Sequence, residues 1–316
     1  MKNEKEKAGK EGNWMEKKDA MAYLCFGKDE KPAYLKTEGL KDFLAANGYA
    51  SNHLTKARKA KQLEFIDLKK NEDQENEWAA ASCDFCGQPI NGVSYQQLAD
   101  GRIRCNECAA SAIEDLEEFQ LLFEQCIQLM QDFYQVTFQV PLEIRTTDSD
   151  EIASRTGFQA PAGLGKKVRV LGFAQNQDGK RTVLIENGSP RLASVDTIVH
   201  EMTHIWQSIS WNEMEFARLY GMGNKKKTRL ASLILHEGMA VWSAIQFLYL
   251  IGETSYASRQ EAIMEERKDE YGLGFLLFRK HFPLIKTTDF LYRTPFRIFP
   301  PIPPQELRSI VNAIFS

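Results

Sequence analysis

Apolar residues recur at steps of three and four positions along much of the chain, and this period is typical of amphipathic helices. Four segments have it: 109–134, 194–209, 230–250 and about 259–281. Cys126 occupies one position of the first apolar stripe, so we expect it to be a small core residue rather than a reactive thiol. The final segment contains too many prolines for a long helix until Gln305.

Shorter apolar runs predict strands at 136–144, 168–174 and 182–185, and the last two flank an Asp178-Gly179 turn. A further hairpin is expected around Asp100-Gly101, because glycine tolerates the positive φ that such turns require. These elements predict an α+β protein in which a small sheet precedes a mainly helical C-terminal half.

The N-terminal quarter has a different composition. Residues 1–33 are rich in Lys and Glu, so we expect them to be mostly disordered. Residues 34–78 hold two short apolar sets and end in the acidic run NEDQENEW, which predicts a small helical module followed by a linker. We therefore expect a cysteine-rich unit with a long helix at 79–135 and one larger domain at 136–316.

Charge and hydropathy limit the class of partner. The 316 residues carry a formal net charge of −3, so the overall balance does not favour a nucleic acid or an acidic membrane. No run approaches the roughly 20 continuous apolar residues that cross a bilayer, and the first residues lack a signal-peptide segment. We expect a soluble, cytoplasmic protein with no membrane partner.

Four of the six cysteines form two Cys-x-x-Cys pairs, Cys83 with Cys86 and Cys105 with Cys108. In a reducing compartment this spacing favours a metal over disulfides, because four thiolates at such separations converge on one tetrahedral ion. We expect one structural zinc, held in a finger.

The predicted helix at 194–209 carries the motif His-Glu-x-x-His at His200, Glu201 and His204. Histidines four residues apart differ by only about 40° around a helix, so both imidazoles can hold one zinc ion. Glu201 can reach a metal-bound water without being a ligand, which is the position of a general base. So short a motif also occurs by chance, and a buried His pair can simply be hydrogen-bonded, so a third ligand is needed to support it.

The next helical segment, LILHEGMAVWSAI, offers that ligand in Glu237. Two histidines and one glutamate with an open water position form an established catalytic zinc site. Gly238 and Ala240 leave room for a close helix approach. His236 is a rival ligand, but it precedes Glu237 by one residue and points about 100° away around the helix. We interpret His236 as lining the pocket or supporting the ligands.

Several motifs together carry a family resemblance: CDFCGQPINGVSYQQLADGRIRCNEC, SAIEDL, VPLEI, HEMTHIW, HEGMAVWSA and YGLGF, between about Ser82 and Pro283. In this order they resemble the plant organ-size-regulating peptidases of the Da-one type, which combine a LIM-like zinc finger with a C-terminal HExxH peptidase domain. The resemblance implies a zincin-like, gluzincin-like fold and a set of roles. These are His200, His204 and Glu237 as zinc ligands, Glu201 as catalytic glutamate, and the four cysteines as the last finger motif.

The resemblance also implies one more catalytic group. Tyr271, in the YGLGF motif, is the candidate donor to the transition-state oxyanion, and His281 is a weaker one. The plant members carry ubiquitin-interacting helices and a fuller LIM region, whereas residues 1–80 here show no acidic helix of that kind. Control by ubiquitin is therefore not carried over, and the short architecture is more similar to a prokaryotic relative.

These observations predict a zinc-dependent endopeptidase with one catalytic and one structural zinc, acting on a protein or peptide substrate. The sheet edge at Thr182–Glu186 is expected to pair with extended substrate backbone. The finger or residues 34–70 could bind a partner protein.

The alternative is a non-catalytic zinc-finger protein that binds a partner or nucleic acid, with the peptidase domain as a scaffold. Its support is a short cationic run, Lys56, Arg58, Lys59 and Lys61. A solvated helix face explains that run better, because the run is short and the overall charge is near neutral. Nucleic acid is therefore the less favoured partner.

Overall fold

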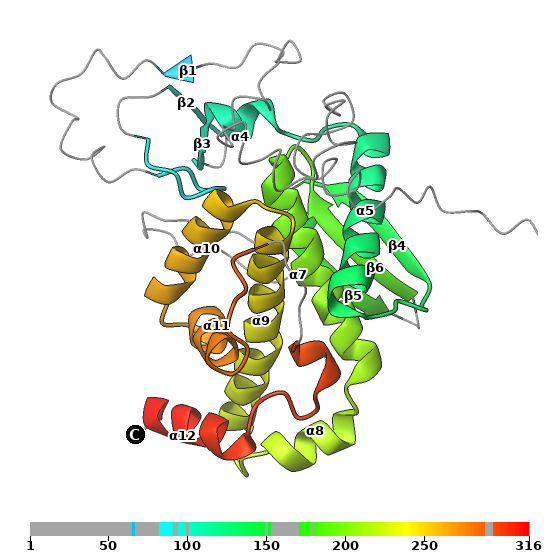
Figure 1. Cartoon of the computed structure of the whole chain (residues 1–316), viewed down its shortest axis with the longest axis vertical. Coiled ribbons are helices and arrows are strands. Elements are labelled where there is room, and N and C mark those ends of the chain that lie inside the picture. Colours follow the sequence, from blue (N-terminus) through cyan, green and yellow to red (C-terminus); the bar gives the residue numbers. More distant parts are fainter. Residues whose placement is uncertain are drawn as a thin grey trace, which may run out of the picture.

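The computed structural model describes residues 82–90, 94–98, 101–148, 151–152, 171–177, 180–287 and 293–315, and the backbone of strand β1 (Phe65–Ile66). The N-terminal segment at 1–33, the cationic run at 56–61 and the expected linker at 71–78 lie outside the described residues. Within them, two small sheets and a group of long helices form a mixed α and β fold (Figure 1).

The cysteine-rich unit is a small sheet followed by a short helix. Strand β2 (Tyr95–Gln97) pairs antiparallel with β3 (Ile103–Cys105), and Gly101 between them has a φ of 84°. The expected hairpin and its glycine turn are confirmed. Helix α4 (Asn106–Ala110) follows at once, and β1 pairs with the other side of β2. Phe65–Ile66 is therefore extended, where the sequence pattern suggested a helical module.

A break separates α4 from α5 (Leu116–Tyr134), so the single helix predicted for 109–134 is wrong at its start. Asp115 caps α5 by accepting a hydrogen bond from a backbone N–H of its first turn. The residues before this cap bond to a distant segment: Ile113 N–H donates to Ser189 O, and Gly188 N–H donates to Ile113 O. Periodicity could not reveal the break, because the apolar spacing continues through it.

The second sheet has the order β4-β6-β5. Strand β4 (Leu142–Thr147) runs parallel to β6 (Lys180–Glu186), and β5 (Gly172–Gln177) pairs antiparallel with β6. The hairpin around 178–179 is confirmed, whereas the strand predicted from Val136 begins only at Leu142. Because β6 is the central strand, the prediction that Thr182–Glu186 forms an edge is wrong. Within the described residues, the edges of this sheet are β4 and β5.

Helices make up most of the remaining described chain. The helices α7 (Arg191–Ser210) and α9 (Lys225–Leu250) run through the middle of the molecule (Figure 1). The helical region predicted for 259–281 is two helices, because Asp269 caps a new one. The others are α8 (Glu213–Tyr220), which the pattern missed, α10 (Thr254–Glu266), α11 (Glu270–His281), the 3-10 helix η6 (Pro295–Arg297) and α12 (Pro304–Ile314).

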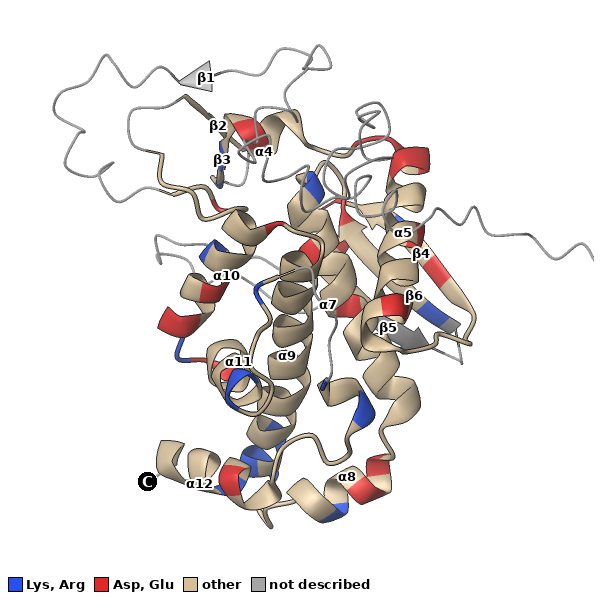
Figure 2. Cartoon of the chain, in the orientation of Figure 1, with Lys and Arg blue, Asp and Glu red and all other residues tan. Residues whose placement is uncertain are grey.

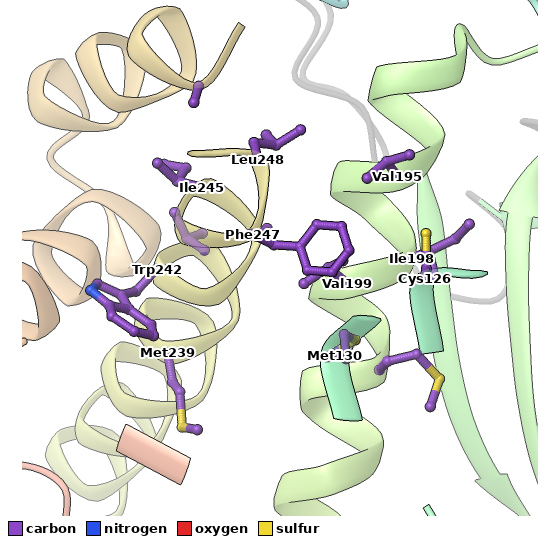
Figure 3. Packing of buried hydrophobic residues seen from close by; sticks show 14 of the residues in the cluster. Cys126, Met130, Val195, Ile198, Val199, Met239, Trp242, Ile245, Phe247 and Leu248 are labelled. Atoms are coloured by element: carbon purple, nitrogen blue, oxygen red, sulfur yellow. The ribbon is translucent and has the colours of Figure 1, made fainter. Parts of the chain in front are cut away.

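The main core lies where α5, α7 and α9 meet. Phe247 of α9 points toward Val199 of α7, and Cys126 of α5 lies beside Ile198 of the same helix (Figure 3). Cys126 is fully buried, and burial raises the pKa of its thiol, so its expected core position is confirmed. Tyr134 OH, at the end of α5, donates to Ser243 O of α9 at 2.5 Å. One core therefore continues across residue 135, where a domain boundary was expected.

Helix α9 is largely enclosed by the rest of the fold. It is the one described helix whose length and mean hydropathy of 1.3 would suit a membrane span, but 83% of that apolar stretch is buried inside the fold. Its Trp242 is fully buried and donates its indole N–H to Phe282 O at 2.7 Å. These properties are those of a central core helix, and α7 and α11 pack along it.

Two candidate metal centres

The four cysteines come together within the unit formed by β2, β3 and α4. Cys83 and Cys86 lie on a tight turn before β2, while Cys105 ends β3 and Cys108 lies in α4. Their sulfur atoms are all within 4.8 Å of one another, and Cys86 Sγ is 3.8 Å from Cys105 Sγ. None of the four is more than 6% exposed. This closed set could hold one metal ion.

The thiols of this first centre perturb one another. Contact with Cys105 lowers the pKa of Cys83, and contact with Cys105 raises the pKa values of Cys86 and Cys108. Four thiols this close cannot all ionise unless a cation compensates their charge. The donor chemistry of the centre therefore suits a thiophilic metal.

Helix α10 holds one side of the cysteine unit. Tyr256 OH donates to Phe85 O at 2.9 Å, and Arg259 Nε donates to Cys86 O at 2.7 Å. A Cβ on Gly87 would come within 2.8 Å of Ile263, so the turn and the helix are in close contact. A cavity of about 300 Å³ lies at this junction and not at the second centre described below.

The start of α7 holds the other side. Arg102 forms a buried ion pair with Glu186 at the end of β6, and Arg104 Nη1 donates to Gly188 O at 2.8 Å. Arg191 N–H, in the first turn of α7, donates to Ser111 O just after α4. The cysteine unit is therefore fixed to the same helix that carries the His-Glu-x-x-His motif.

The second centre combines side chains from two helices: His200 and His204 on α7 and Glu237 on α9. The two imidazole Nε2 atoms are 3.1 Å apart, and Glu237 Oε2 lies 3.2 Å from His200 Nε2 and 3.4 Å from His204 Nε2. This set could also hold one metal ion. The three side chains are 18%, 22% and 17% exposed, so the second centre opens to solvent while the first is closed.

The donors of the second centre suit a cation. Glu237 Oε2 is buried and accepts no well-directed hydrogen bond from the described residues, although both imidazoles lie at ion-pair distance. Burial lowers the pKa of His204, but contact with Glu237 outweighs this effect and raises the pKa to about 9. Burial also raises the pKa of Glu237, yet the two histidines hold it well below its usual range. A divalent ion would compensate donors arranged in this way.

Glu201 lies beside this set without belonging to it. It is 7% exposed, and burial raises the pKa of its carboxyl, an effect that His200 and His204 oppose. The carboxylate accepts a hydrogen bond from the backbone N–H of Ala174 in β5. A carboxylate with a raised pKa next to a metal site is suited to accept and return a proton.

His236 faces away from the second centre. Its ring centre lies 4.8 Å from that of Trp211 and 5.2 Å from that of Phe216, and its Nδ1–H donates to Ser232 O at 2.7 Å. The structure therefore places Glu237, and not His236, with the two motif histidines.

Tyr271 reaches the centre because α9 and α11 touch backbone to backbone. A Cβ on Gly238 or on Gly274 would overlap main-chain atoms of the other helix. The Tyr271 ring lies 6.2 Å from that of His200 and nearly parallel to it, at 19°. Burial raises the pKa of Tyr271, and the carboxylate of Glu237 adds to this effect, so the phenol keeps its proton and can donate it in a hydrogen bond.

His281, the weaker oxyanion candidate, lies about 15 Å along α11 from Tyr271 by the helical rise. Its Nε2 is 2.7 Å from Glu306 Oε2 of α12, so the structure does not bring it to the centre.

Two residues that sequence reasoning missed do approach the centre. Arg267 lies over the Tyr271 ring at 4.6 Å, and Gln207 Oε1 is 2.9 Å from His204 Nδ1. Only the second had a signal in the sequence, since residues three apart on a helix share a face.

Known proteins provide no independent guide to either centre. No protein-family model, no curated protein and no solved structure matches this chain. A functional assignment therefore depends on the geometry of the two centres and on the motifs in the sequence.

Proposed function

We propose that this protein is a zinc-dependent endopeptidase of the HExxH type, with a zincin-like catalytic part and a LIM-like finger. The observation that carries the proposal is that His200 Nε2, His204 Nε2 and Glu237 Oε2 converge on one point. Glu201 lies next to this set but is not one of its donors. Two imidazoles and one carboxylate leave a fourth position for water or substrate. The motif resemblance to the Da-one type of peptidase supports the same assignment.

The spacing of the donors supports zinc at both centres. Around a tetrahedral zinc, bonds of ~2.0–2.1 Å separate neighbouring nitrogen or oxygen donors by about 3.3 Å, and bonds of ~2.3 Å separate sulfurs by about 3.8 Å. The corresponding distances here are 3.1, 3.2 and 3.4 Å in the second centre and 3.8 Å between Cys86 and Cys105. The four thiolates would hold a structural ion, and the mixed set a catalytic one.

The residues of the chain have distinct roles in the proposed hydrolysis. The zinc, when bound, supplies Lewis acidity toward water and the substrate carbonyl. Glu201 accepts a proton as the water oxygen bonds to the carbonyl carbon, and it delivers that proton to the amide nitrogen as the C–N bond breaks. Tyr271 donates a hydrogen bond to the oxyanion that develops on the carbonyl oxygen.

Strand β5, rather than β6, is the edge suited to bind substrate. Its backbone meets the site directly, because Ala174 N–H bonds to Glu201. An extended peptide that pairs with this edge would place its main chain along the two histidines.

The decisive experiment compares the wild type with Glu201→Gln. The amide cannot accept a proton, so we expect proteolysis to fall about 10²–10⁴-fold while two zinc ions per chain remain. New protein termini in a cell extract incubated with each form provide the readout of cleavage. Equal cleavage by both forms, or no cleavage by the wild type with its second centre fully loaded, would count against the proposal.

A further inference from the structure

We propose that Gln207 is a positioning residue of the second centre, which fixes the proton of His204 and links the two helices that carry the metal ligands. This inference rests on the proposed zinc site. Gln207 follows His204 by one turn of α7 and is only 2% exposed. Its carboxamide uses both ends: Oε1 lies 2.9 Å from His204 Nδ1, and Nε2 donates to His236 O at 3.1 Å.

The second contact determines which imidazole nitrogen of His204 carries the proton. A backbone carbonyl can only accept, so the NH₂ end of Gln207 must face His236 O. The oxygen of Gln207 therefore faces His204 Nδ1, and that nitrogen must donate. Once Nδ1 holds the proton of a neutral imidazole, the lone pair of Nε2 is free for a metal ion.

The same carboxamide also sets the position of α9. His236 directly precedes Glu237, and its carbonyl lies in a helix interior, where a second lone pair stays available after the helical hydrogen bond is made. The hydrogen bond from Gln207 therefore does not compete with the hydrogen bonds inside α9. It ties α7 to α9 at the residue next to the third ligand.

The two histidines differ in the contacts that their Nδ1 atoms make. Among the described residues, no hydrogen bond reaches His200 Nδ1, and the ring of His200 lies instead alongside that of Tyr271. His204 thus has the more constrained tautomer. We therefore expect the loss of Gln207 to lower the zinc affinity of the second centre more than the stability of the fold.

The test is the zinc affinity of the second centre in the full chain, measured by competition with a chromophoric chelator. Gln207→Met keeps the length of the side chain and removes both hydrogen bonds. We expect zinc to bind about 10–100-fold more weakly, the usual effect of losing such a partner.

Gln246→Met is the matched control. Gln246 is a fully buried glutamine of α9 whose carboxamide also makes two hydrogen bonds, both of 2.8 Å, to the backbone of Ile285. We expect Gln246→Met to lower the melting temperature about as much as Gln207→Met does, while its zinc affinity stays equal to that of the wild type.

Gln207→Glu separates the two roles of the carboxamide. A carboxylate still accepts a hydrogen bond from Nδ1–H but no longer donates to His236 O, so this variant keeps the constraint on His204 and loses the link to α9. We expect its zinc affinity to fall by less than that of Gln207→Met. In ¹⁵N-histidine spectra, a hydrogen-bonded Nδ1–H of His204 should be present in the wild type and in Gln207→Glu, and absent in Gln207→Met.

Three results would overturn the inference: zinc affinity in Gln207→Met equal to that of the wild type, an equal loss in Gln246→Met, or an equal loss in Gln207→Glu. Failure of the proposed zinc site has a different signature, because the wild type itself would then bind only one zinc per chain, and so would all three variants. Failure of the proposed peptidase activity alone would leave two zinc ions in the wild type and no cleavage that depends on Glu201.

Discussion

The two candidate metal centres differ in how their geometry is determined. The cysteine donors come from one short stretch, residues 83–108, and a turn, a hairpin and a short helix place them together. The histidine and glutamate donors lie on two long helices, and only the packing of α7 against α9 brings them together. The first centre is thus a local structure, and the second depends on the whole core.

The largest effect is expected when the local centre is removed. Cys105→Ser deletes one thiolate, and the binding free energy of a structural zinc, on the order of 10 kcal/mol, is folding free energy for a unit this small. The unit also bonds to α10 and to the start of α7, so its loss should lower the melting temperature of the whole chain. Elemental analysis should give one zinc where the wild type has two. An unchanged melting temperature would show that the unit is an independent appendage.

Removing a ligand of the second centre should lower the stability of the fold less than Cys105→Ser does, but it should abolish zinc binding at that centre. Glu237→Ala should leave one zinc per chain, keep the cysteine unit folded and lower proteolysis at least as much as Glu201→Gln. His236→Ala is the control, because its ring points toward Trp211. If Glu237→Ala retains two zinc ions and His236→Ala loses one, the ligand assignment is wrong.

A smaller effect is expected where α9 and α11 touch. Gly274→Ala places a methyl group against the backbone of α9, which should cost about 1–3 kcal/mol as the helices move apart. Tyr271 would move with α11, so kcat should fall while both zinc ions remain. Chemical denaturation and a zinc count on the same sample measure the two effects. Stability equal to that of the wild type would mean that the contact is not tight.

The smallest effect concerns Asp196, whose charge acts on His200 of the second centre and on Tyr256, the anchor of the first. Burial raises the pKa of Asp196 to about 6, above the ordinary value of 3.8. A carboxyl with a raised folded-state pKa makes the fold less stable as pH rises from about 4 to 6. Asp196→Asn should therefore gain about 1–2 kcal/mol at pH 7 and almost nothing at pH 4. An equal gain at both pH values would exclude titration of Asp196 as the cause.

The sequence predicted most of the elements and the side chains of both centres, because spacing along the chain encodes them. Two Cys-x-x-Cys pairs and two histidines four residues apart each imply proximity within one local structure. Glu237 could be chosen over His236 because their directions differ around one helix. Spacing along the chain could not reveal the features that depend on tertiary contacts.

Two particular errors have this origin. The break before Leu116 exists because residues 111–113 bond to residues 188–191. The strand at Thr182–Glu186 is central because β4, distant in the sequence, pairs along its second side. Each needed a pairing between segments that no local pattern records.

The long apolar stretch of α9 also has a consequence for the chain before it folds. Helix α9 begins with Lys225, Lys226 and Lys227, seen as blue at its lower end in Figure 2, and no acidic residue lies in its first turn. Cations at a helix N-terminus disfavour the folded helix slightly. In the unfolded state, however, the same charges flank a long apolar segment that can self-associate, and charged flanks of this kind suppress aggregation. We therefore expect the refolding yield to depend on these lysines, and to fall as salt screens them.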